Sequence, residues 1–84
     1  MELHRYRKEI GALVRKFREE AGLTLQELIN KEREDYALVS ENTLLDLEKG
    51  KKIPKQEILD AILNALGITM QDLLLEVKKG KFAT

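Results

Sequence analysis

Residues 39–50 read VSENTLLDLEKG, and this stretch carries the signals of one complete helix. Ser40 belongs to the residue types that cap helix N-termini, because its hydroxyl can accept a hydrogen bond from a first-turn amide. Leu44 and Leu47 follow at the spacing that places two side chains on one helix face, and Gly50 is a typical helix terminator. The stretch therefore predicts an amphipathic helix between Ser40 and Gly50 whose inner face is formed by the two leucines.

Two helices are expected before this stretch. Apolar residues recur at intervals of three and four through residues 3–21, which predicts one helix with Gly22 as its C-terminal cap. Thr24 and Glu27 form the pattern of a capping box, so a second helix is expected to begin there. This helix then enters KEREDY, a charged stretch without a clear stop signal. The apolar positions of the first helix are Leu3, Tyr6, Ile10, Leu13, Val14, Phe17 and Ala21.

Two further helices are expected after residue 50. Pro54 is expected at the first position of a fourth helix, where its missing amide hydrogen costs nothing. Gly67 closes that helix, and Thr69 caps a fifth that runs toward the tail KKGKFAT. No strand pattern, linker or repeat interrupts the series, so residues 1–84 are expected to form a single all-α domain of five helices.

The composition of the chain limits its class. Its 84 residues contain no cysteine, so neither a disulfide framework nor a thiolate metal site can support the fold. No apolar run approaches the roughly 20 residues of a membrane helix, and the N-terminus lacks the apolar region of a signal peptide. We therefore expect a soluble, cytoplasmic protein with no cofactor, no metal and no membrane partner.

The charged residues are unevenly distributed. Fifteen basic and fifteen acidic side chains cancel, which is unusual for a protein that binds a polyanion. Residues 23–48 contain two basic and seven acidic side chains, a net charge of −5, whereas the segments on either side have a basic excess. The position of each charge is therefore more informative than the total.

Three stretches together resemble the phage-repressor (Cro-like, Xre-like) helix-turn-helix family, over about residues 10–74. IGALVRKFREEAGLT at residues 10–24 is similar to the first helix of the family. VSENTLLDLEKG is similar to its third helix, and PKQEILDAILNALGI at residues 54–68 to its fourth. The resemblance implies a five-helix, lambda-repressor-like DNA-binding domain. The function it implies is a sequence-specific transcriptional regulator that binds double-stranded DNA as a homodimer.

The chain departs from the family pattern around its second helix. The segment between Thr24 and Val39 is about five residues longer than the tight connection of the family, and Leu38 stands where the turn glycine is usual. Ile29 replaces the small residue of the second helix, and Leu25 replaces a glutamine that often opens it. We therefore expect a lengthened connection between helices two and three, wide enough for the larger side chain.

The family resemblance implies which residues contact DNA. The N-terminal part of the third helix would face the bases in the major groove. Asn42 can donate to and accept from an adenine edge, and Glu41 or Asp46 can accept from cytosine. The competing interpretation of the basic residues is a solvated lysine face. The implied base-reading residues are Ser40, Glu41, Asn42, Thr43 and Asp46, and the implied phosphate-binding residues are Lys49, Lys51, Lys52 and Lys55, with Arg15 and Lys16 as weaker candidates.

Two further features have a structural interpretation. Arg18 and Glu48 match family positions whose side chains pair between the first helix and the end of the third, against the alternative of two separately solvated charges. A surplus of apolar residues on the first and fifth helices would mark a dimer interface, against the alternative of a few exposed leucines. The residues of this expected interface are Leu13, Met70, Leu74 and Leu75.

Catalysis is not expected. His4 is the only histidine and Ser40 the only serine, so a Ser-His-Asp arrangement has few possible members. The alternative to a DNA-binding regulator is instead a protein-interaction module, in which the acidic middle segment of a helix-turn-helix scaffold binds a basic protein and DNA affinity is weak or lost.

Overall fold

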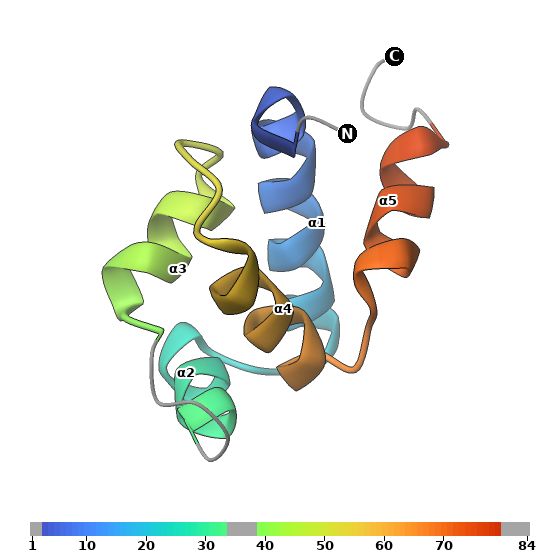
Figure 1. The fold of residues 1–84 in the computed structure, drawn as a ribbon. Helices are drawn as coiled ribbons and strands as arrows, with labels where there is room; N and C mark the ends of the chain where they lie inside the picture. The colour runs from blue at the N-terminus through green and yellow to red at the C-terminus, as the bar shows by residue number, and fades with distance from the viewer. Residues whose placement is uncertain (1–2, 34–38, 80–84) are drawn as a thin grey trace.

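Helices account for all the regular structure in the part of the chain that the structure describes. The structure is a computed structural model, and it describes residues 3–33 and 39–79. Five α-helices and no strand occur in these residues, so the all-α prediction is confirmed (Figure 1). The elements are η1 (Leu3–Tyr6, a 3-10 helix), α1 (Arg7–Glu20), α2 (Leu25–Arg33), α3 (Glu41–Glu48), α4 (Gln56–Ala65) and α5 (Met70–Lys78).

Hydroxyl side chains define three of the helix starts, as the sequence predicts. Each hydroxyl accepts a hydrogen bond from the amide three residues further on, which satisfies an otherwise unpaired donor of the first turn. Glu27 in turn accepts a hydrogen bond from the amide of Thr24, and Asp72 accepts one from the amide of Thr69, so α2 and α5 start with complete capping boxes. The three caps are Thr24, Ser40 and Thr69.

Two predicted helix boundaries are wrong. Pro54 is not the first residue of α4, because α4 begins at Gln56 and the extended backbone of Lys55 (φ −55°, ψ 148°) forms the cap position. The first helix does not run unbroken from residue 3, because the backbone of Tyr6 leaves helical geometry (φ −106°, ψ 22°) and separates the tighter η1 from α1. Of the predicted apolar positions, Leu3 and Tyr6 in η1 are only partly buried against the core, and Ala21 after α1 is exposed.

The hydrophobic core receives buried side chains from all five α-helices. Its centre contains Ile10 from α1 and Leu44 from α3, both 0% exposed. Leu13 is only 1% exposed and belongs to this core, so its predicted place in a dimer interface is wrong. The reason is that α1 lies between α3 and α5, and both sides of its apolar stripe are therefore covered (Figure 1).

The predicted lengthening of the connection between α2 and α3 falls mainly on residues 34–38, which lie outside the described residues. Within the described residues, Ile29 is 2% exposed, so the larger side chain is accommodated in the core rather than displaced from it. The predicted replacement of the turn glycine by Leu38 lies outside the described residues.

No single helix within residues 3–33 and 39–79 is long and apolar enough to cross a membrane. The helices α4 and α5 meet the requirements of length and composition only when taken together, and the chain bends by 91° between them.

The closest helix contact is between α1 and α3. Gly11 faces the last turn of α3, and a Cβ atom at this position would overlap the carbonyl oxygen of Leu47. The carbonyl oxygen of Glu48 would lie only 3.2 Å from the same Cβ. The absence of a side chain at Gly11 therefore allows the backbone of α1 to touch the C-terminal end of α3.

We predict that Gly11→Ala lowers the free energy of unfolding by about 2 kcal/mol, because the added methyl group must push two helix backbones apart. Alanine is a better helix former than glycine by about 1 kcal/mol. The expected loss of about 2 kcal/mol is therefore the net effect, after this gain in helix propensity has been subtracted. Gly67→Ala is the control: its φ of +77° disfavours alanine by about 1 kcal/mol, but no atom lies within 4 Å of the added methyl group. Urea denaturation measures both changes. A Gly11→Ala variant as stable as the parent would contradict the close contact.

Candidate nucleic-acid interface

The outer face of α3 is a stripe of mainly polar side chains. Leu44 and Leu47 are fully buried, which leaves the opposite side of the helix to the solvent. Residues three, four and seven positions after Asn42 share this side of the helix with it. Two of these residues are exposed and two are partly exposed, and together they form what we call the α3 stripe: Asn42, Leu45, Asp46 and Lys49.

The predicted base-reading residues differ in what their side chains already contact. Ser40 Oγ accepts a hydrogen bond from the Thr43 amide at 3.1 Å and lies 2.8 Å from Thr43 Oγ1, so both hydroxyls take part in the helix cap. Glu41 and Asn42 are exposed at the start of α3, and Asp46 is partly exposed one turn later. The latter three residues are thus the better placed for contact with a ligand.

Arg18 and Glu48 form the predicted ion pair between α1 and α3. Arg18 Nε lies 2.7 Å from Glu48 Oε2 and Arg18 Nη2 lies 3.0 Å from Glu48 Oε1, so the pair is bidentate. The two side chains are only 12% and 6% exposed, respectively. Hydrogen bonding to Glu48 raises the pKa of Arg18 above its ordinary value. Arg18 Nη1 also donates to the carbonyl oxygen of Leu23 at 2.7 Å, which ties the turn before α2 to the same pair.

Gly11 and Arg18 act on adjacent residues of α3. They are seven residues apart, which places them two turns apart on the same side of α1. Gly11 contacts the backbone of Leu47, and Arg18 holds the side chain of Glu48. We call this contact the α1–α3 clamp. It fixes the last turn of α3 against α1 and so determines the direction in which the α3 stripe faces.

A loop rich in lysine continues from α3. Residues 49–55 contain four exposed lysines and no acidic residue. Glu48 is neutralised by Arg18, so within residues 40–55 the four lysines stand against Glu41 and Asp46, a balance of four minus two, or +2. The amide of Lys51 donates to the carbonyl oxygen of Asp46 at 2.9 Å, which holds the loop against α3. The lysines are Lys49, Lys51, Lys52 and Lys55.

Lys8 joins this basic group, although the sequence analysis missed it. Gly50, which is buried with a φ of +74°, lies so close to α1 that a Cβ there would be 3.0 Å from the Cα of Lys8. Lys8 is exposed and therefore stands beside the lysine loop. No local sequence signal indicates this, because the two positions come together only when α1 packs on α3.

Leu45 was also missed, although the helical spacing of α3 contains the signal for it. Its position one turn after Asn42 on the side opposite the buried leucines can be derived from residues 40–50 alone.

Arg15 is less well placed for phosphate than the loop lysines. It pairs with Glu19 at 3.2 Å on the surface of α1, where the two side chains are 63% and 56% exposed. Such an exposed pair contributes little to stability and can open, but its acidic member lowers the local attraction for an anion.

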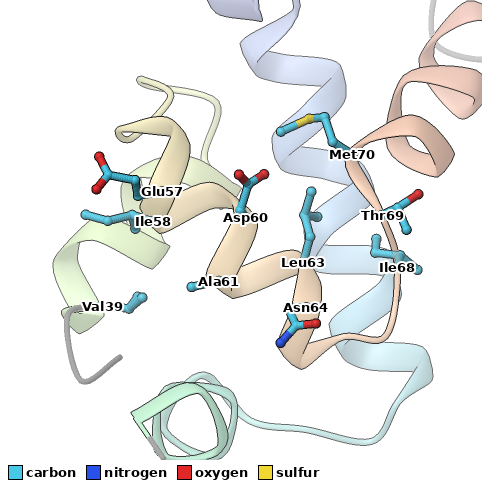
Figure 2. Close-up of a pocket in the computed structure, with 10 residues that line it drawn as sticks. All are labelled: Val39, Glu57, Ile58, Asp60, Ala61, Leu63, Asn64, Ile68, Thr69 and Met70. Atoms are coloured by element: carbon cyan, nitrogen blue, oxygen red, sulfur yellow. The ribbon is translucent and has the colours of Figure 1, made fainter. Parts of the chain in front are cut away.

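A hollow of about 530 Å³ lies on the outer side of α4, and we call it the α4 groove (Figure 2). Ala61 is part of its floor, and Ile68 comes from the segment before α5. Glu57 and Asp60 line its acidic side. The two carboxylates make this groove unsuited to a polyanion.

Comparison with known proteins identifies the motif. A family model described as a helix-turn-helix domain matches residues 9–77. The chain belongs to the helix-turn-helix family. No curated protein sequence matches it. The match includes α2 and α3 in full, and α3 carries the stripe.

Two solved structures of the clp gene regulator ClgR from Corynebacterium glutamicum are similar to this helix-turn-helix chain. One is 36% identical with a TM-score of 0.74, and the match covers 88% of this chain and 73% of that one. The other is 37% identical with a TM-score of 0.72, and the match covers 87% of each chain. The five-helix arrangement is thus shared with a transcriptional regulator.

We predict strong energetic coupling between Arg18 and Glu48. Arg18→Met or Glu48→Leu alone leaves one charge buried without its partner and should each cost about 3 kcal/mol of unfolding free energy. The double variant should cost less than either single one, because no unpaired charge remains. The Arg15→Met and Glu19→Leu cycle is the matched control, with an expected coupling below about 0.5 kcal/mol for an exposed pair. Strictly additive costs at Arg18 and Glu48 would show that the pair does not fix α3.

Proposed function

We propose that this chain is a sequence-specific DNA-binding transcriptional regulator of the phage-repressor (Cro-like) type, acting by binding and not by catalysis. The observation that carries the proposal is the exposure and anchoring of α3 in a helix-turn-helix chain. Its outer stripe is exposed or partly exposed, its last turn is held by the α1–α3 clamp, and it continues into a loop with four exposed lysines.

The proposed contacts follow from the chemistry of each side chain. The major groove of B-DNA, about 12 Å wide, admits an α-helix, and α3 would enter it with its N-terminal turn foremost. Asn42 would pair with the N6 and N7 atoms of an adenine. Glu41 or Asp46 would accept from the N4 amino group of a cytosine. Ser40 and Thr43 remain candidates for base contact, and their hydroxyls would have to make it in addition to their hydrogen bonds in the helix cap.

Phosphate neutralisation is assigned to the loop after α3. Phosphate contacts fix the register of a protein on the duplex, and each one contributes to the salt dependence of affinity. The proposed contacts are Lys49, Lys51, Lys52 and Lys55, with Lys8 as an addition and Arg15 as a weaker candidate.

Dimerisation is the second part of the proposal. Leu75 is 51% exposed on α5 and lines a hollow of about 700 Å³ with Tyr6 and Met70, which we call the α5 groove. Leu74 lies in the same groove. A second copy that covered these side chains would remove apolar surface from water and present two α3 helices to one duplex.

A protein-interaction module is the alternative function, and one observation favours it. The acidic side of the α4 groove is complementary to a basic protein and not to DNA. This alternative retains the helix-turn-helix fold and assigns the binding surface to α4 in place of α3.

We predict binding to duplex DNA that weakens steeply as salt is added. In Lys51→Gln/Lys52→Gln the slope of log affinity against log salt should become shallower by about two, because each lost phosphate contact removes about 0.9 from it. Lys31→Gln is the control, since Lys31 is exposed on α2. Helix α2 lies at the end of the molecule away from the loop of residues 49–55 (Figure 1). Fluorescence anisotropy of labelled duplex pools measures the slopes. Absence of binding at low salt by folded protein would contradict the proposal and favour the protein-interaction module.

We predict that the chain is a homodimer and that Leu75→Glu converts it to a monomer, because the change places a charge in the apolar contact. Gln56→Glu adds the same charge at an exposed position on α4, outside the α5 groove, and should leave the dimer intact. Light scattering after size exclusion gives the mass. A monomeric parent at high concentration would show that the exposed leucine has no interface role.

A further inference from the structure

One leucine of α3 has no place in the hydrophobic core. Leu44 and Leu47 are 0% exposed, whereas Leu45 is partly exposed and lies on the α3 stripe between Asn42 and Asp46. Among the described residues, the core and the partly buried side chains packed against it do not include Leu45. Core packing therefore does not account for a large aliphatic side chain at this position.

The surroundings of Leu45 indicate the chemistry of what it contacts. Its neighbours on the stripe are an amide and a carboxylate, which recognise polar edges. The major groove presents polar groups at every base pair, and its characteristic apolar group is the C5 methyl of thymine. An aliphatic side chain on a helix that lies in this groove thus has one complementary partner among the four bases.

We propose that Leu45 is a specificity-determining residue that packs against a thymine methyl group next to the base pair read by Asn42. The proposal rests on the proposed DNA-binding function. Side chains at i and i+3 lie about 5–6 Å apart on a helix. Successive base pairs are about 3.4 Å apart along the duplex. The thymine therefore lies one or two base pairs from the adenine that pairs with Asn42.

The contact adds selectivity without adding charge. Glu41 and Asp46 already place two negative charges near the phosphates, so α3 gains little general attraction for DNA. Burial of a methyl group against Leu45 is independent of salt, and it distinguishes thymine from cytosine, which lacks the methyl. Selectivity from this contact should therefore persist at salt concentrations that weaken the lysine contacts.

The test removes the methyl group from the DNA and the leucine from the protein in turn. Preferred duplexes are first selected from a random pool with the full chain, and each thymine of the selected site is then replaced singly by deoxyuridine, which pairs identically but lacks the methyl. We expect one such replacement per half-site to weaken binding about four-fold, the effect of exposing one methyl-sized group. The other replacements are internal controls.

The variant Leu45→Ala should bind the thymine and uracil duplexes equally, while Leu45→Met, which keeps an aliphatic contact, should retain the preference. Thermal melting confirms that both variants are folded, as expected for substitutions between good helix formers outside the core. A selected site insensitive to every uracil replacement, or a preference that persists in Leu45→Ala, would overturn the role of Leu45 and leave the proposed function standing. Absence of any DNA binding would overturn both.

Discussion

The contact between α1 and the last turn of α3 is the constraint on which the rest of this structure depends. Gly11 permits it by having no side chain, since any Cβ there would meet the carbonyl oxygen of Leu47. Arg18, two turns along α1, completes it with two hydrogen bonds to Glu48. Gly11 sets the distance between α1 and α3, and Arg18 sets their relative rotation. With both fixed, the inner leucines of α3 enter the core and its polar stripe faces the solvent.

The same contact between α1 and α3 also changes how the acidic segment of residues 23–48 bears on DNA binding. Residues 23–48 have a net charge of −5, which by itself argues against a DNA-binding surface. Glu48 is one of these charges, and Arg18 neutralises it within the α1–α3 clamp. α3 then carries two further carboxylates, Glu41 and Asp46, beside the four loop lysines and the nearby Lys8. The chain can therefore be neutral overall and still present a locally basic rim, because folding separates charges that are mixed along the sequence.

The sequence predicted those features that depend on residues close together along the chain. The hydroxyl caps at Thr24 and Ser40 act over three residues, and both were found. The Arg18–Glu48 pair spans thirty residues and was predicted only through the family resemblance. Helical spacing places Leu13 beside Ile10 on the apolar stripe of α1, but its burial was missed because α3 and α5 together cover that stripe. The approach of Lys8 to the lysine loop was also missed, because it depends on how α3 packs against α1. Composition carries no signal for helix packing of this kind.

The clamped α3 stripe and the loop after it form the surface that we propose meets DNA. Amide chemical shifts of the labelled chain, followed while a selected duplex is added, test this surface residue by residue. We expect the largest changes at Asn42, Leu45 and the lysines of residues 49–55, with smaller ones at Lys8. Changes confined to the α4 groove, around Asp60 and Asn64, or no change on α3 at saturation, would contradict the proposal.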